Sequence, residues 1–374
     1  MIYRIVGEYE GIYGIMKKVL IILTVTVKYG IGQVVKDYTS VLYKNIHFDF
    51  LLCNGGHEEY LDYISKIGGE VVTLPVSRLH QPFKYMKHLT YLLKEKKYDV
   101  VHVHGNSGTM FFDIHAAKCA KVRVRIAHCH SSNSNYKVVH YLLKPLLNRE
   151  ITDALACSRE AGGWLFTHEY NVLNNAIDTK RFAFSNVQRN KLRKRYGIKN
   201  EFVMLNVGRL CEEKNQKFLF KVLSELLIQD PCFRLVLVGD GELAESLREQ
   251  ANELKINDKV VFAGRQKEVE YYYSMADCFL FPSIFEGLGI VLIEGQASGL
   301  KCVASNAIPK EANVAGLVEY IGLNAEEWVE KIISIKKEIK CDRIEVSKDA
   351  IEKIRKKEYD IEISSLYLNS IYEK

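Results

Sequence analysis

Residues 202–240 have the sequence FVMLNVGRLCEEKNQKFLFKVLSELLIQDPCFRLVLVGD, and this stretch determines the predicted fold. Two short apolar runs, 202–207 and 234–238, flank an amphipathic stretch at 217–227. The runs have the length and composition of buried strands, and the apolar spacing between them is typical of a helix. Strand, helix and strand in this order predict a βαβ unit with two parallel strands.

The same alternation continues in both directions along the chain. Val19–Val27 is a predicted strand, followed by a glycine loop at 29–32 and a predicted helix at Gln33–Tyr43. Further predicted strands are 48–53, 70–74, 100–104, 123–128, 260–262, 278–281 and 301–304. We therefore predict the α/β class, with two Rossmann-like, doubly wound parallel-sheet domains facing a central cleft.

A basic stretch at 190–197 separates the two series and is interpreted as a solvated helix near the interdomain linker. We predict an N-terminal domain at 16–180 and a C-terminal domain at 181–357. A helix at about 358–374 is predicted to pack back on the first domain. Met16 precedes the first strand directly, so residues 1–15 are interpreted as an upstream extension.

The composition excludes several classes of protein. With 374 residues, 48% hydrophobic and 26% charged, the chain is neither disordered, nor collagen-like, nor a multi-span membrane protein. The formal charge of +6 arises in residues 1–180, which hold 22 basic and 16 acidic residues (22 − 16 = +6). This half either faces an anionic partner or has an ordinary surface with a slight lysine excess. The nine scattered cysteines, without a secretory signal, predict reduced thiols in a cytoplasm.

The strongest motif is Phe285–Glu294, FEGLGIVLIE, where two carboxylates flank a Gly-x-Gly turn. A strand gives way to a helix here, so backbone amides and the positive helix end would meet a phosphate. If the whole segment were helical, its two carboxylates would lie roughly 12 Å apart. That separation suits hydroxyl groups on both sides of a diphosphate better than an acid/base pair on one bond.

Two further turns follow predicted strands. Arg209 and Lys214 come after the strand at 202–207, and together could offset the charge of a leaving diphosphate. Residues 239–244 fit the looser G-x-G-x-x-A form of the dinucleotide fingerprint, although such a turn mostly marks tight packing.

Four histidines occur at two predicted strand ends: His102, His104, His128 and His130. They could hold a metal, but polar residues lining a cleft are the preferred interpretation. The sequence has no D-x-D, so an obvious carboxylate pair for Mg²⁺ is missing, and no metal site or cofactor is predicted.

The motifs Gly208-Arg209…Lys214-Asn215, Val238–Glu242, Phe262–Gly264 and Pro282…Glu294 follow one another in a known order. In this respect the chain resembles the retaining glycosyltransferases of glycosyltransferase family 4, which have the GT-B fold. The resemblance covers most of 202–314, and residues 125–133 and 157–161 resemble capsule and exopolysaccharide members.

The resemblance implies a role for each matching residue. Arg209 and Lys214 would bind the donor diphosphate, and Glu286 would contact the donor sugar. Glu294 would bind the ribose, and His130, or as the less favoured choice His128, would lie near the reacting sugar. Further donor contacts would come from the amides of Gly287, Leu288 and Gly289 to phosphate, from Gly264 and Arg265 to the base, and from Gly30, Gly32 and Gly208.

The implied reaction transfers a sugar from a nucleotide diphosphate sugar to a glycan or polyprenyl-linked acceptor in surface polysaccharide synthesis. The configuration of the sugar would be retained, and UDP is the expected nucleotide. The stretch 136–148 is either a peripheral contact with an anionic membrane, at its cytoplasmic face, or a core helix. Two alternatives stay open: a nucleotide-sugar epimerase of the same fold and a catalytically silent nucleotide-binding partner. Nucleic-acid binding is not expected.

Overall fold

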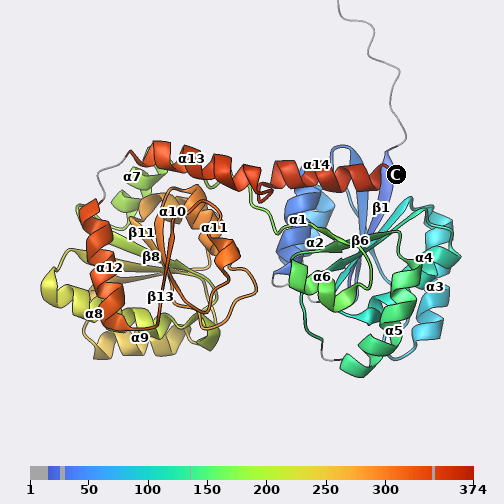
Figure 1. Ribbon diagram of the computed structural model, residues 1–374, viewed down its shortest axis with the longest axis horizontal. Helices are drawn as coiled ribbons and strands as arrows, with labels where there is room; N and C mark the ends of the chain where they lie inside the picture. The colour runs from blue at the N-terminus through green and yellow to red at the C-terminus, as the bar shows by residue number, and fades with distance from the viewer. Residues whose placement is uncertain (1–15, 26–29, 135, 339–341) are drawn as a thin grey trace, which may run out of the picture. The chain divides into compact units, whose positions relative to one another are not determined.

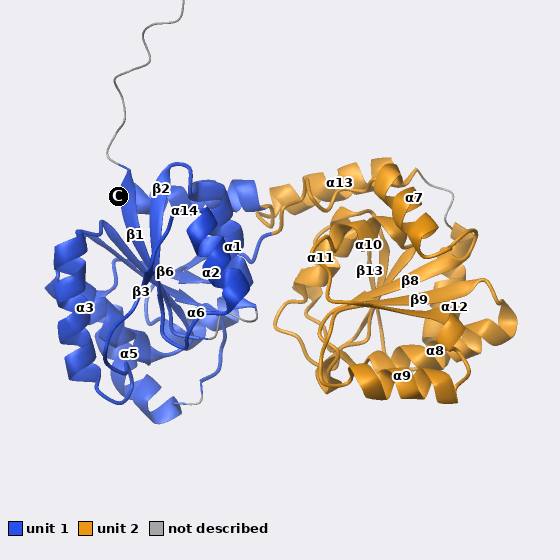
Figure 2. Cartoon of the chain, turned by 180° about the vertical axis from the view of Figure 1, so that it is seen from behind, with its two compact units in different colours: residues 1–176, 361–374 blue, residues 177–360 orange. Residues whose placement is uncertain are grey.

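The computed structural model describes residues 16–25, 30–134, 136–338 and 342–374. The interpretation of 1–15 as an extension falls outside the described residues, as does Tyr29 of the predicted glycine loop. The chain forms two compact units, coloured separately in Figure 2. Unit 1 extends to Ala176 and includes Ile361–Lys374, and unit 2 is Ile177–Asp360. The sequence analysis predicted that the chain passes from the first domain to the second after residue 180 and returns to the first after residue 357.

Unit 1 alternates strands and helices along the chain. Its elements are β1 Lys17–Leu23, α1 Ile31–Leu42, β2 Ile46–Leu52, α2 Glu58–Lys66, β3 Val71–Val72, α3 Pro82–Lys96, β4 Val100–Gly105, α4 Phe111–Cys119, β5 Val124–Cys129, α5 Lys137–Glu150, β6 Asp153–Ala156, α6 Arg159–Leu165, β7 Asn171–Val172 and α14 Ile361–Tyr372.

The described strands of unit 1 form one parallel sheet in the order β3-β2-β1-β4-β5-β6-β7. Helices cover both faces, with α1, α2 and α14 packed on one and α3, α4 and α5 on the other. The strand order reverses between β1 and β4, so the loops after these neighbouring strands diverge to opposite faces. Such a reversal opens a crevice at the carboxyl ends of the strands, where ligands bind in folds of this kind.

Unit 2 repeats the plan. Its elements are α7 Asn186–Arg195, β8 Phe202–Val207, α8 Gln216–Gln229, β9 Phe233–Val238, α9 Ala244–Glu253, β10 Val260–Gly264, α10 Glu270–Met275, β11 Cys278–Phe281, α11 Ile290–Ala297, β12 Lys301–Ser305, β13 Val318–Ile321, α12 Ala325–Glu338 and α13 Arg343–Lys356.

The described strands of unit 2 are also parallel, in the order β10-β9-β8-β11-β12-β13. One face is covered by α8, α9 and α12, the other by α7, α10, α11 and α13 (Figure 1). The reversal here lies between β8 and β11. The predicted α/β class with two doubly wound parallel sheets is confirmed.

The C-terminal helix α14 completes the core of unit 1. Leu368, Ile371 and Tyr372 are at most 2% exposed and pack in the cluster formed by β1, β2 and α1. The Tyr372 ring meets Phe48 edge-on, with ring centroids 6.1 Å apart. Burying a side chain of this size contributes about 1.5–3 kcal/mol to folding. Residues 361–372 therefore belong to a hydrophobic core that begins more than 300 positions earlier in the sequence.

Some predicted elements differ from the observed ones. The last strand predicted from the sequence ends at residue 304, but the structure adds β13 at the edge of the sheet. Its sequence, VEYI, mixes polar and apolar residues, so no apolar run predicts this strand. The predicted strand at 70–74 contracts to the two residues of β3. The glycine loop was expected to end at Gly32, whereas α1 begins at Ile31, so Gly32 is helical and buried. Gly30 is the residue that takes the positive φ of 40° before the helix.

Two loops of unit 2 approach each other so closely that a glycine is required. The Gly208 amide donates to the Val238 carbonyl at 2.9 Å, and the Leu210 amide to the Asp240 carbonyl at 3.0 Å. A Cβ added at Gly239, where φ is +139°, would lie 1.9 Å from the Gly208 carbonyl oxygen. The glycines at 239 and 241 thus serve close packing of the loops after β8 and β9, as the sequence suggested for this turn.

We predict that Gly239→Ala lowers the thermal unfolding midpoint. The added methyl must displace backbone, and the positive φ strains any L residue by about 1–3 kcal/mol. Gly163→Ala is the matched control, because Gly163 is helical and exposed and its added Cβ meets nothing within 4 Å. That control is expected to be neutral or slightly stabilising. Equal midpoints for Gly239→Ala and the unaltered protein would contradict the close approach.

Candidate active site

The strand reversal of unit 2 joins two of the predicted motifs. β8 and β11 are hydrogen-bonded neighbours, and the loops after them are linked by two further bonds. The Ile284 amide donates to the Glu213 carbonyl at 2.8 Å, and the Asn215 side-chain amide donates to the Pro282 carbonyl at 3.3 Å. The Gly-Arg…Lys motif and the Glu-Gly-x-Gly motif are therefore held side by side.

Lys214 and Glu286 form an ion pair across these two loops. The Lys214 ammonium also lies 5.3 Å from the centroid of the Phe281 ring. The two charged side chains are 23% and 13% exposed, so water screens their attraction only partly. A cation predicted to bind phosphate and a carboxylate predicted to touch sugar thus contact each other in this structure.

Arg209 also has a carboxylate partner. Its guanidinium lies 3.0 Å from the Glu242 carboxylate, and both side chains are about half exposed. Sequence reasoning did not single out Glu242 as a partner, although it lies in the motif after β9. The close contact between the loops after β8 and β9 brings it within reach. Each predicted phosphate-binding cation is therefore paired with an acidic side chain of the same unit.

The turn 287–289 leads directly into α11. Gly289 is the N-cap with φ +83°, and a Cβ there would lie 3.0 Å from the Phe281 ring. Gly287 is exposed and has open space around its Cβ position. Since helical geometry begins at Ile290, Glu286 lies outside the helix, and the separation of roughly 12 Å calculated for a fully helical segment does not apply to the two carboxylates. The amides at the start of α11 nevertheless form a helix end that attracts anions.

Glu294 is fixed by a residue that the sequence analysis missed. The Tyr273 hydroxyl on α10 donates to the Glu294 carboxylate at 2.7 Å and also lies 3.2 Å from the Val291 carbonyl. Tyr273 is fully buried, and its burial, with the adjacent carboxylate, raises its pKa well above the usual value. The hydroxyl thus remains protonated and orients Glu294. No local sequence signal identifies a partner 21 residues away.

Gly264 and Arg265 lie at the end of β10, on the far side of β9 from β8. The Gly264 carbonyl accepts a hydrogen bond from the Gly239 amide at 2.9 Å, and Gly264 itself has φ +67°. Arg265 is exposed. These residues extend the row of loops at the carboxyl ends of β8, β9 and β10.

The predicted residues of unit 1 lie near its own reversal. His130 follows β5, and its Nε2 lies 2.9 Å from Nδ1 of His104 at the end of β4. Burial lowers the pKa of His130 to about 3, so its imidazole is neutral at pH 7. His102, His104 and His128 are at most 4% exposed, and burial followed by the neighbouring imidazoles lowers their pKa values. The interpretation of these three as residues lining an open cleft is therefore wrong.

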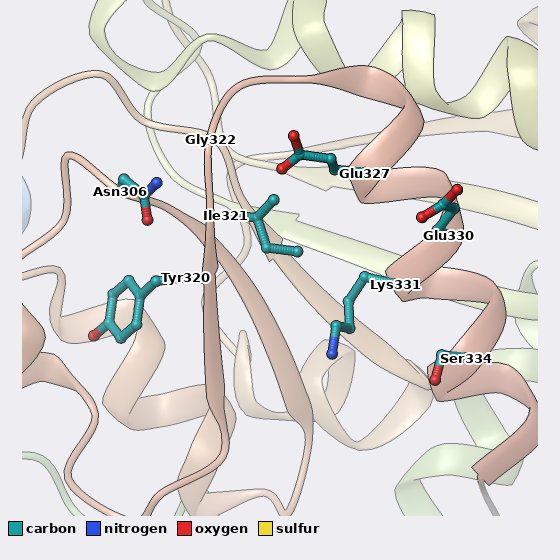
Figure 3. A pocket seen from close by; sticks show the side chains of 8 residues that line it. All are labelled: Asn306, Tyr320, Ile321, Gly322, Glu327, Glu330, Lys331 and Ser334. Atoms are coloured by element: carbon teal, nitrogen blue, oxygen red, sulfur yellow. The ribbon is translucent and has the colours of Figure 1, made fainter.

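A shallow hollow of about 480 Å³ lies elsewhere in unit 2, between β13 and α12 (Figure 3). Its rim includes Glu327, Glu330 and Lys331 from the helix and Tyr320 from the strand. The predicted donor residues are absent from its lining. The candidate active site of unit 2 is thus the group of loops that follow β8, β9, β10 and β11.

Known proteins resemble this chain along most of its length. The family described as Glycosyl transferases group 1 matches residues 188–357. EpsF of Bacillus subtilis (strain 168), named as a glycosyltransferase, is 30% identical over 334 residues, covering 84% of this chain and 87% of EpsF. CapH of Staphylococcus aureus, named as a capsular polysaccharide biosynthesis glycosyltransferase, is 26% identical and covers 91% of this chain and 95% of CapH.

The fold also matches solved structures. The Anabaena protein HepE in complex with UDP superimposes with a TM-score of 0.76 at 19% identity, covering 95% of this chain and 99% of HepE. WaaG, a glycosyltransferase of lipopolysaccharide biosynthesis, has a TM-score of 0.63 at 15% identity, covering 94% of this chain and 98% of WaaG. Among the described residues of the present chain, every helix is too short or too polar to cross a membrane.

We predict that a double-mutant cycle with Lys214→Met and Glu286→Gln gives a coupling free energy of about 1 kcal/mol or more in unfolding experiments. The pair is shielded from water, whereas Arg209 and Glu242 are half exposed. The same cycle on Arg209 and Glu242 should fall toward the low end of the roughly 0.2–1 kcal/mol typical of exposed pairs. Equal couplings for the two pairs would show that the loops after β8 and β11 do not hold Lys214 against Glu286.

Proposed function

Because the chain belongs to the group 1 glycosyl transferases, we propose that it transfers a hexose from a nucleotide diphosphate sugar to a hydroxyl of a growing surface polysaccharide. EpsF and CapH support the transferase class, and the name of CapH supports a role in polysaccharide synthesis. The observation that carries the proposal is the Lys214–Glu286 contact across the β8/β11 reversal. In this contact the cation proposed to bind phosphate meets the carboxylate proposed to bind sugar.

The donor diphosphate is proposed to bind between the loop after β8 and the start of α11. Arg209 and Lys214 supply positive charge, and the amides of residues 287–289 supply hydrogen-bond donors. In this proposal an incoming phosphate takes the Lys214 ammonium from Glu286, and the released carboxylate turns to the sugar hydroxyls. Before the substrate binds, the Glu286 carboxylate thus occupies the position at the Lys214 ammonium that the phosphate takes later.

UDP is the proposed nucleotide, and the HepE complexes with UDP and UDP-glucose support this choice. Glu294 is proposed to accept hydrogen bonds from the ribose hydroxyls. A carboxylate can accept several hydrogen bonds, so the bond from Tyr273 orients the group without exhausting it. Gly264 and Arg265 are proposed to lie against the base.

The transfer is proposed to retain configuration, as the resemblance to family 4 implies. The leaving phosphate takes the proton of the acceptor hydroxyl on the face where the new bond forms, so no protein base is required. Arg209 and Lys214 offset the negative charge that develops on the diphosphate, in place of a metal ion. His130 is proposed to lie near the reacting sugar, where its neutral imidazole offers a hydrogen bond. Gly30 and Gly32 are proposed as further donor contacts.

The acceptor is proposed to be a glycan on a polyprenyl carrier, approached at the cytoplasmic surface of an anionic membrane. Helix α5 supports this contact. Val138 is 74%, Tyr141 60% and Leu142 69% exposed, and their spacing places them on one side of the helix. The opposite side packs on unit 1 through His140 and Leu147. An exposed apolar face in the half of the chain that carries the net charge of +6 matches a surface of anionic lipid.

We predict that Arg209→Ala and Lys214→Ala each lower turnover about 100- to 1,000-fold, as removal of one donor to a developing negative charge does in other enzymes. Lys217→Ala is the matched control, because Lys217 lies near the same loop and pairs with Glu212 at the surface. The assay measures UDP release from UDP-sugars with a lipid-linked acceptor, after a thermal-shift screen of nucleotides has identified the donor.

The same assay separates the alternatives. Near-normal turnover in both variants would refute the assigned roles, and conversion of the nucleotide sugar without acceptor would indicate an epimerase. Nucleotide binding without turnover of any donor would indicate a silent partner.

In Glu286→Gln, UDP affinity should be kept or increased while turnover falls, because the competitor for Lys214 is removed together with the sugar contact.

We predict that the protein floats with vesicles containing phosphatidylglycerol at low salt and that Val138→Asp/Leu142→Asp abolishes this binding. Ile228→Asp is the control, since Ile228 is 86% exposed in unit 2 and lies outside α5. High salt should weaken binding, because attraction to the anionic surface contributes to it. Failure of the unaltered protein to float at low salt would refute the membrane contact.

A further inference from the structure

Unit 1 contains a cluster of histidines that the proposed transfer does not need. His102 and His104 lie two positions apart on β4, and His128 on β5 is the register partner of His104. Alternation and parallel pairing direct these three side chains to one face of the sheet. The same face is covered by the C-terminal helix α14, whose Tyr372 reaches His102.

The three imidazoles are buried together with unpaired ring nitrogens. One nitrogen from each of His102, His104 and His128 lies within 4.8 Å of the other two. Within the described part of the chain, Nε2 of His102, Nε2 of His104 and both nitrogens of His128 have no hydrogen-bond partner. Buried polar groups are nearly always paired, so a concentration of four such atoms at one place calls for a ligand.

The remaining nitrogens of His102 and His104 are fixed. Nδ1 of His102 lies 2.7 Å from the Tyr372 hydroxyl, and Nδ1 of His104 lies 2.9 Å from Nε2 of His130. In these two rings Nδ1 has a partner, which leaves Nε2 as the nitrogen available to an ion. Metal-binding histidines have this arrangement, in which a second group orients the ring through the nitrogen that does not bind the metal.

We propose that His102, His104 and His128 bind one first-row transition metal ion, with Zn²⁺ as the reference ion. Imidazole nitrogen is a preferred ligand of this class, and three protein ligands leave a fourth position for water or another group. Carboxylates and thiols are not among the three grouped ligands, which distinguishes this site from a Mg²⁺ or an iron–sulfur site.

The rings of the cluster lie close together. His102 and His104 are stacked with centroids 4.1 Å apart, and His102 and His128 with centroids 5.4 Å apart. Zn–N bonds of about 2.0–2.1 Å in a tetrahedral site place the nitrogens roughly 3.4 Å apart. In the present arrangement one nitrogen of each ring lies within 4.8 Å of the other two, so a bound ion would draw the three nitrogens together. His130, which contacts His104, is partly exposed.

This site belongs to unit 1, whereas the proposed diphosphate site belongs to unit 2. Its effect would be on unit 1 itself, because His102 connects the ion to Tyr372 and so to α14. A bound ion would tie the C-terminal helix to β4 and β5. The inference does not rest on the proposed transfer, although His130 contacts His104, and its test measures metal binding and not activity.

The test uses the full chain, freed of metal by chelator dialysis and titrated with Zn²⁺ in a calorimeter. We expect saturation at one equivalent per chain and loss of that equivalent in His102→Gln and His128→Gln. His88→Gln is the matched control, since His88 is an exposed histidine of the same unit. Tyr372→Phe should weaken binding about 10- to 100-fold, the usual effect of removing a group that orients a metal ligand.

X-ray absorption of the zinc-loaded, unaltered protein decides the ligand type, even if a histidine variant fails to fold. A shell of about three imidazoles with Zn–N distances of about 2.0–2.1 Å supports the site. A sulfur shell at about 2.3 Å would show binding by cysteines and overturn the proposal. It would also be overturned by the absence of a saturable equivalent, or by full binding in both His102→Gln and His128→Gln.

Discussion

The parallel pairing of β8 with β11 places the loops after these strands side by side, and the rest of the candidate active site depends on that arrangement. Lys214 and Glu286 are 72 residues apart in the chain and meet because the strand order reverses between them. Crossover helices on opposite faces leave this edge of the sheet uncovered. A site for an anionic, hydroxyl-rich ligand can therefore form without distortion of either strand.

Charge compensation is a common feature of these loops. Lys214 is paired with Glu286, and Arg209 with Glu242. Each acidic partner balances the charge of one cation in these loops. The proposed substrate supplies its own negative charge and replaces one partner. The more buried pair, Lys214–Glu286, is the one in which this exchange has the larger energetic consequence.

The two units carry different side chains at the ends of similarly arranged strands. In unit 2 the carboxyl ends of the strands carry glycine turns and charged side chains, whereas in unit 1 the ends of β4 and β5 carry neutral histidines. Those histidines lie beneath α14, which joins unit 1 only after the chain has completed unit 2. The last helix thus contributes both to a hydrophobic core and to the surroundings of the proposed metal site.

The amino-acid sequence by itself determined the alternation of strands and helices, the two-domain plan and the order of the glycine and charged motifs. These features depend on local apolar periodicity and on turn residues, which are visible within a few positions. The tertiary structure decided that Lys214 contacts Glu286, that Tyr273 orients Glu294, that three histidines are buried together and that β13 completes the second sheet. Each of these depends on which distant strands pair and which helix covers them, and hydrogen bonding between remote segments leaves no periodic trace in one sequence.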